Sequence, residues 1–219
     1  MLARGEELAR LGESARRRLE ETHRAREEAL TRCRDTIRAC GLAIRAVHRV
    51  DFPLAADRRA EAQSALRRAQ EVLAPFAALA AAGFLHDAEK EYAEACLTDA
   101  LVTGSVLPGP DELQVGLPAW LNGLAEAASE LRRHLLDRLR AGESGRGEEL
   151  LGVMEDVYDS LVTIEYPDAI TGGLRRTVDA LRAVVERSRS DVTTTVLQTS
   201  LQRAIEKASG HDPAAGPAG

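Results

Sequence analysis

Four glutamates in two short segments are the residues whose type and spacing best suit chemistry. Glu91 and Glu94 are three residues apart, and Glu126 and Glu130 are four apart. Both spacings place two carboxylates on one helix face, where like charges are slightly destabilising unless something offsets them. Four convergent carboxylates would make a site of hard oxygen ligands suited to Mg²⁺ or Mn²⁺. Taken alone, the spacing favours the alternative of two solvated acidic faces, since 29% of the residues are charged.

A row of arginines near the end of the first predicted helix is a candidate for binding nucleic acid. Its members are Arg34, Arg38, Arg45 and Arg49. By the 3.6-residue period they fall within about one quadrant of a helix, where guanidinium groups can follow a phosphate backbone. The alternative is an ordinary solvated face whose arginines pair with nearby acids. Both interpretations stay open at this point.

The segments that must position these residues all have helical patterns. Aromatic residues are only 3% of the chain, so the core must consist of Leu, Val, Ile and Ala, which favours helix-on-helix packing. We predict an all-α, single-domain bundle of about seven helices over residues 1–208, followed by a disordered tail, 209–219. The predicted helices span 2–49, 55–73, 76 or 84 to 103, 118–141, 148–164, 170–189 and 191–208.

The long first helix carries an apolar seam with heptad spacing. Its positions are Leu30, Cys33, Ile37, Cys40, Ile44 and Val47. Alternating steps of three and four residues are typical of a bundle or coiled coil, so the seam predicts a packing partner. Three cysteines without paired spacing do not suit a disulfide framework or a zinc site, and two of them fall on this seam. We interpret these two as small core residues.

Composition and missing motifs exclude several function classes. The net charge is −6, which argues against a uniformly basic nucleic-acid binder but not against a local basic stripe. The sequence contains neither a P-loop nor a G-x-G-x-x-G motif. The charged N-terminus does not resemble a signal peptide, and no apolar run has the length of a membrane span. We therefore expect a soluble, cytoplasmic protein with no membrane partner.

A di-iron oxidase is a further alternative. Glu20 and His23 match the Glu-x-x-His half-motif of di-iron helical bundles. Such a site needs a second half-motif, and no other acid lies three residues before a histidine in the required pattern. This absence weakens the di-iron alternative without excluding it.

Four segments in order resemble the translin family, specifically prokaryotic proteins similar to translin-associated factor X (Trax). Residues 38–49 (RACGLAIRAVHR) resemble the end of the family's first helix, and 89–95 (EKEYAEA) resemble the Trax segment QEYVEA. Residues 117–131 (LPAWLNGLAEAASEL) resemble the acidic helix that follows, and 166–176 (YPDAITGGLRR) a segment of archaeal members. The resemblance covers roughly residues 20–205.

The resemblance implies a fold of about seven helices, octameric assembly as a homo-oligomer, and binding of RNA or single-stranded DNA. For Trax-type subunits it implies a metal-dependent endoribonuclease whose catalytic and metal-binding residues would be Glu91, Glu94, Glu126 and Glu130, with Mg²⁺ or Mn²⁺ as cofactor. Glu126 stands where Trax-type proteins usually carry Asp, although the longer side chain can still ligate a metal. A non-catalytic oligomer that binds RNA or single-stranded DNA is the alternative within the family.

Overall fold

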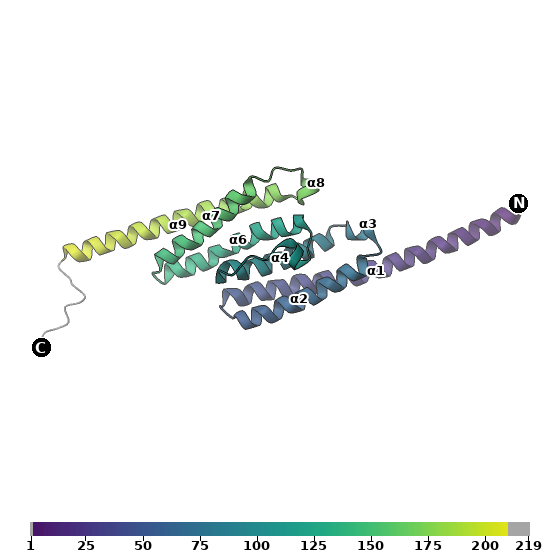
Figure 1. The fold of residues 1–219 in the computed structure, drawn as a ribbon, viewed down its shortest axis with the longest axis horizontal. Helices are drawn as coiled ribbons and strands as arrows, with labels where there is room; N and C mark the ends of the chain where they lie inside the picture. Colours follow the sequence, from purple (N-terminus) through teal and green to yellow (C-terminus); the bar gives the residue numbers. More distant parts are fainter. Residues whose placement is uncertain (1, 210–219) are drawn as a thin grey trace.

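The structure is a computed structural model that describes residues 2–209, and the only regular secondary structure within these residues is helical. Figure 1 shows an elongated bundle in which the first and the last helix extend towards opposite ends. The all-α prediction is confirmed. Six long helices form the bundle: α1 (Leu2–His48), α2 (Phe52–Leu73), α4 (Phe84–Thr103), α6 (Leu117–Arg140), α7 (Ser144–Val162) and α9 (Leu174–Ala208). No helix in this part of the chain is both long enough and apolar enough to cross a membrane.

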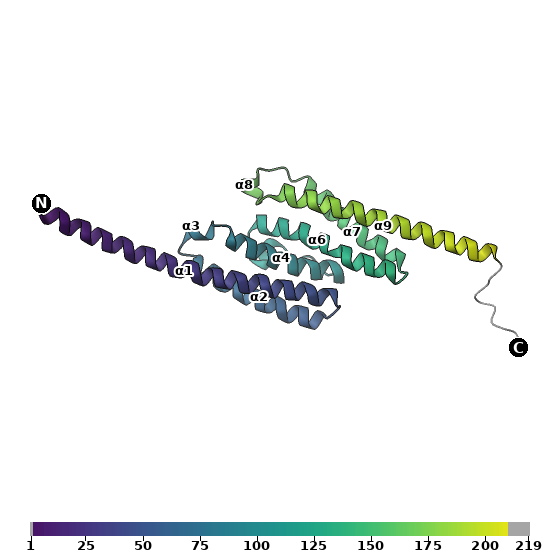
Figure 2. The same cartoon turned by 180° about the vertical axis from the view of Figure 1, so that it is seen from behind.

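The helices are stacked so that α4 and α6 occupy the middle of the bundle. α1 and α2 form a hairpin that packs on one side of α4, and α6 packs on the other side. α7 and α9 then cover the far side of α6, as Figures 1 and 2 both show. The two predicted acidic segments lie on α4 and α6, so this stacking places them next to each other inside the bundle.

Local signals in the sequence explain most helix boundaries. Between α1 and α2, the carboxylate of Asp51 accepts a hydrogen bond from the backbone N–H of Leu54, and Pro53 lies in the first turn of α2. α4 ends at Gly104, whose φ of 72° is a left-handed conformation that glycine adopts without strain. Pro118 lies in the first turn of α6, as predicted.

Two helix predictions were wrong in detail. The predicted helices 170–189 and 191–208 are one continuous helix, α9, because no glycine or proline interrupts residues 174–208. Asp191 does not begin a new helix, and its side chain instead forms an ion pair with Arg132 of α6 at 2.8 Å. Three four-residue helices were also missed: α3 (Ala77–Ala80), α5 (Pro110–Leu113) and α8 (Asp168–Thr171). Residues 210–219 of the predicted tail lie outside the described part of the chain.

The buried face of α1 differs from the predicted heptad seam. Cys33, Cys40 and Val47 are buried as expected, but Ile37 is 37% exposed and Thr36 is fully buried in its place. Alanines fill much of this face, and small residues allow the α-helices to approach closely. The heptad spacing predicted the correct side of α1 as buried. It wrongly included Ile37 because that residue is large and aliphatic, and it omitted Thr36 and the buried alanines.

Both ends of the molecule carry exposed apolar side chains. The first part of α1 extends beyond the bundle at one end, and the last part of α9 extends beyond it at the other (Figure 1). Both extensions present exposed leucines or isoleucine: Leu8, Leu11, Leu19, Leu197, Leu201 and Ile205. Apolar surface repeated along a helix is characteristic of a face that another helix covers.

Candidate functional site

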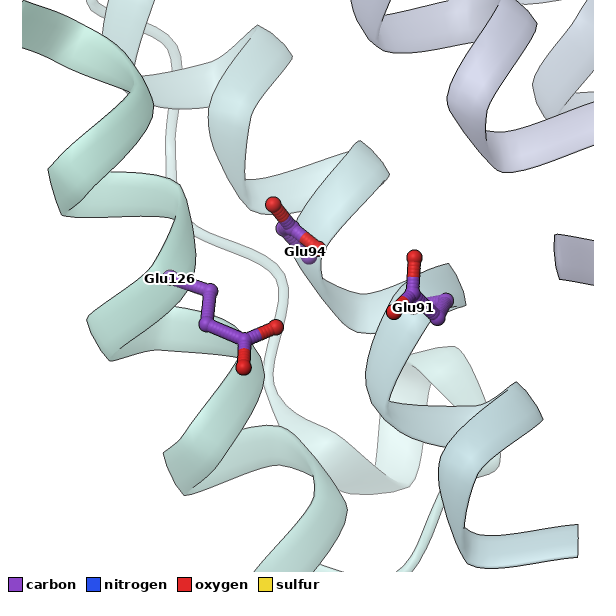
Figure 3. Close-up of side chains that lie close together, drawn as sticks. All are labelled: Glu91, Glu94 and Glu126. Carbon is purple, nitrogen blue, oxygen red and sulfur yellow. The ribbon is translucent and has the colours of Figure 1, made fainter. Parts of the chain in front are cut away.

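Three of the four predicted glutamates converge at the interface between α4 and α6. Glu91, Glu94 and Glu126 each offer a carboxylate oxygen, and these atoms all lie within 4.8 Å of one another. Figure 3 shows the Glu126 side chain extending from α6 towards the two glutamates of α4. We call these three residues the carboxylate cluster. A separation of this size allows one small cation to contact several carboxylates at once.

Close packing of the two helices at Gly123 makes this convergence possible. A Cβ atom added at Gly123 would lie 2.8 Å from the carbonyl oxygen of Lys90 and 2.9 Å from the backbone nitrogen of Glu94. Only a residue without a side chain fits at this distance. Gly123 lies one turn before Glu126 on α6, so the point of closest helix contact is adjacent to the cluster.

Glu94 is the buried member of the cluster. Its exposed fraction is 8%, and no residue in the described chain forms a hydrogen bond with its carboxylate. Burial, followed by the negative charges of Glu126, Glu91 and Glu130, raises the pKa of Glu94 to about 9. A carboxyl group with this pKa carries a proton at neutral pH.

Lys90 neutralises part of the negative charge. Its ammonium nitrogen lies 2.8 Å and 2.6 Å from the two carboxylate oxygens of Glu126 and 3.3 Å from a Glu91 oxygen. Burial acts to lower the pKa of Lys90, but the hydrogen bond and charge of Glu126, followed by those of Glu91, outweigh it and raise the pKa. Lys90 could not be singled out from the sequence, because a lysine between Glu89 and Glu91 resembles an ordinary surface residue.

Glu130 is the predicted site residue that the structure does not bring into the cluster. The Nε2 atom of His48, on α1, lies 2.6 Å from Glu130 Oε2, and His48 Nδ1 lies 3.2 Å from Nε2 of His134. An ionised Glu130 only accepts hydrogen bonds, so the proton of this contact lies on His48 Nε2. The hydrogen bond from His48 lowers the pKa of Glu130 more than burial raises it.

Both histidines were overlooked in the sequence because neither has a partner at metal-ligand spacing. His48 is nearly buried, with 5% of its side chain exposed. Burial, followed by the charge of His48, lowers the pKa of His134, which is consistent with a neutral ring in this chain of hydrogen bonds. Together the two rings hold Glu130 at the edge of the carboxylate cluster.

The four predicted arginines are all exposed; Arg34, Arg38 and Arg45 lie on α1, and Arg49 lies in the turn that follows it. Arg38 forms an ion pair with Asp35 at 3.1 Å. Arg34, Arg45 and Arg49 form no ion pair with any described residue. Arg45 and Arg49 lie on either side of His48 in the sequence, so the C-terminal end of this row is close along the chain to the residue that contacts Glu130. The exposed arrangement fits both a phosphate-binding row and a solvated face.

A cleft of about 930 Å³ lies between α6 and α9, next to the carboxylate cluster rather than over it. Glu130 lines this cleft, together with Arg132, Arg133 and Arg140. Arg132 is held by Asp191, whereas Arg133 is exposed and forms no ion pair within residues 2–209. These arginines could not be predicted as a group from the sequence, because they lie between apolar residues of α6 and show no separate pattern.

The Glu-x-x-His half-motif of α1 does not form part of a di-iron site within the described residues. Glu20 and His23 lie on the exposed surface of α1, and Glu20 forms an ion pair with Arg24 at 2.6 Å. Neither residue belongs to the carboxylate cluster. The donor set of the cluster consists of oxygens alone, which suits Mg²⁺ or Mn²⁺. The unpartnered carboxylate of Glu94 fits a cation as well, because a buried ionised group needs a partner.

The fold has close counterparts among solved structures. A structure of AfC3PO in complex with duplex RNA has 32% sequence identity and a TM-score of 0.69, with 85% of this chain and 96% of that chain covered. The chain belongs to the translin family. A second structure of AfC3PO shares 31% identity with a TM-score of 0.75, covering 85% of this chain and 97% of that chain.

Two other comparisons extend this relationship. A structure of apo-NeC3PO has a TM-score of 0.76, covers 84% of this translin-family chain and 96% of its own, and at 18% identity shows the shared fold alone. An uncharacterized protein of Methanocaldococcus jannaschii is 26% identical over 187 residues, which are 83% of this chain and 81% of the relative. No family model matches the sequence.

Proposed function

We propose that this protein binds RNA and cleaves it at the carboxylate cluster with the help of a bound Mg²⁺ or Mn²⁺ ion. One observation carries this proposal: Glu94 places a buried carboxylate without a hydrogen-bond partner against Glu91 and Glu126. Such an arrangement is costly in a protein that never binds a cation, because burial and mutual repulsion both oppose ionisation. A divalent ion would turn this repulsion into ligation.

The residues of the site have separate roles in this proposal. Glu91, Glu94 and Glu126 would hold the ion, and Glu94 would lose its proton when the ion binds. When bound, the ion supplies Lewis-acid polarisation of the phosphodiester and lowers the pKa of water. Glu130, which His48 keeps ionised, is placed at the cluster's edge to accept the proton of the attacking water.

RNA is the proposed substrate because AfC3PO, at 32% identity, forms a complex with duplex RNA. Exposed arginines in two parts of the fold support this proposal. The row of arginines near the end of α1 finishes at Arg49, directly after His48, and Arg133 and Arg140 line the cleft beside Glu130. Arginines in these positions can neutralise successive phosphates of a strand, so a chain with a net charge of −6 can still bind RNA locally. Single-stranded DNA is a second ligand to test.

We also propose assembly into a homo-oligomer, with the octamer implied by family resemblance as the expected size. The exposed leucines on the α1 extension and the apolar residues at the end of α9 support association. Multi-angle light scattering at micromolar concentration should give a mass well above the 23.7 kDa of one chain. A stable monomer would contradict this part of the proposal.

RNA cleavage by purified protein tests the catalytic proposal. Labelled single-stranded and duplex RNA should each be incubated with Mg²⁺ or Mn²⁺, with EDTA as the metal-free control. We expect cleavage that EDTA stops, and loss of cleavage in Glu94→Ala with RNA binding retained. Glu148→Ala removes an exposed carboxylate of α7 and should cleave like wild type. Undiminished cleavage by Glu94→Ala would refute the assignment of the site.

A binding protein without nuclease activity is the second candidate, and the ion pair of Lys90 with Glu126 is the observation in its favour. An internal cation can stabilise the cluster without any metal. In that case RNA binding should decrease with salt while no cleavage occurs with either ion.

A further inference from the structure

Lys90 places a permanent positive charge inside the carboxylate cluster. Its ammonium contacts both oxygens of Glu126 and one oxygen of Glu91, and 21% of its side chain is exposed. The contacts join α4 to α6 and involve two of the three carboxylates of the cluster. They show that part of the ligand set is already occupied by a cation that belongs to the chain itself.

The charges around the cluster can balance one divalent ion but not two. With all three glutamates ionised, the cluster and Lys90 together have a net charge of −2. One Mg²⁺ neutralises this charge, whereas a second ion would leave an excess of positive charge in a partly buried site. A fourth carboxylate would offset that excess, but the hydrogen bond with His48 holds Glu130 outside the cluster.

We propose that Lys90 is the built-in second cation of this site, which limits the carboxylate cluster to one divalent ion and competes with that ion for Glu126. This inference rests on the proposed metal-dependent function. A two-ion site clamps both the attacking and the leaving oxygen of the phosphodiester. Here the ammonium supplies the positive charge that a second ion would provide.

Lys90 should lower the affinity of the carboxylate cluster for a divalent ion. An incoming ion must draw the Glu126 carboxylate away from Lys90, and the flexible four-carbon side chain of lysine allows the ammonium to move aside. The ion also enters beside a like charge. Both effects weaken binding, so replacing Lys90 by a neutral residue of similar length should strengthen it.

Titration with Mn²⁺, monitored by the electron paramagnetic resonance signal of the free ion, measures both stoichiometry and affinity. We count as site ions those Mn²⁺ ions whose binding is lost in Glu94→Gln. We expect one site ion per chain in wild type. In Lys90→Gln we expect the Kd to fall by about tenfold or more, as estimated for removing a charge some 4 Å from the ion, together with a weaker second ion. Lys207→Gln, which changes the other lysine of the chain, should match wild type.

The outcomes separate this proposal from the metal site itself. Two site ions in wild type, or an unchanged Kd and stoichiometry in Lys90→Gln, would overturn the role of Lys90 and leave the metal site intact. Absence of any site ion in wild type would overturn both. If Lys90→Gln does not fold, Lys90→Met replaces it, and the wild-type stoichiometry still decides between one ion and two.

Discussion

Replacing Glu94 by glutamine should stabilise the metal-free protein at pH 8, although it removes a proposed metal ligand. Glu94 is nearly buried, and its pKa is raised from 4.5 to about 9 by burial and by the neighbouring carboxylates. A group with a raised pKa in the folded state favours folding at low pH. That contribution is complete below pH 4.5 and is lost as the pH rises towards 9. Glutamine resembles the protonated carboxyl group and does not ionise.

The magnitude follows from the pH interval. Between 4.5, the pKa of an unperturbed glutamate, and pH 8 lie 3.5 units. Each unit corresponds to about 1.4 kcal/mol, so the ionisation linkage is at most about 5 kcal/mol at pH 8. Movement of the Glu94 side chain towards solvent reduces this ionisation cost. We therefore expect Glu94→Gln to raise the free energy of unfolding by about 1–3 kcal/mol at pH 8 and by little at pH 5.

Urea unfolding in EDTA from pH 5 to pH 9 measures this difference. Glu148→Gln is the control, since Glu148 is exposed on α7 and its charge does not contribute to the raised pKa of Glu94. The control should not gain stability as the pH rises. Addition of Mg²⁺ at pH 8 should stabilise wild type and leave Glu94→Gln nearly unchanged. Unfolding curves of wild type and Glu94→Gln that stay parallel over the whole pH range would refute the reasoning.

Three further predictions concern the surroundings of the cluster. His48→Ala should lower the free energy of unfolding by about 1.5–3 kcal/mol in urea, because an ionised glutamate loses its hydrogen-bond donor; an unchanged value would contradict this network. Gly123→Ala should cost about 1–3 kcal/mol and weaken Mn²⁺ binding through overpacking, whereas Gly152→Ala, where a new Cβ meets nothing within 4 Å, should be neutral or stabilising. Arg38→Ala combined with Arg45→Ala should weaken RNA binding and lower its salt slope by about two units in a filter-binding series; normal binding would identify the row as a solvated face.

Local patterns in the sequence were sufficient to predict most of the long helices. Pro118 and Gly104 mark boundaries through backbone geometry that depends on a single residue, so these boundaries can be read from the sequence. The break before Asp191 was wrong because an acidic residue in a β-branched stretch resembles a helix cap. Only the tertiary contact with Arg132 distinguishes an ion pair within a continuous helix from such a cap.

The carboxylate cluster was predictable only in part. Spacing on each helix and the family resemblance indicated four glutamates, and three of them meet in the structure. Spacing could not show that Glu130 turns towards His48, because His48 lies 82 residues away on a different helix. The same limit applies to Lys90. A charge beside two glutamates in the sequence resembles an ordinary surface residue until the packing of α6 brings Glu126 against it.

An anomalous difference map from a crystal soaked in Mn²⁺ tests the central claim most directly. We expect one strong peak within coordination distance of Glu91, Glu94 and Glu126, with the Lys90 ammonium displaced from Glu126. A map without a peak at these carboxylates, collected from protein that cleaves RNA in the same Mn²⁺ buffer, would contradict the assignment of the metal site.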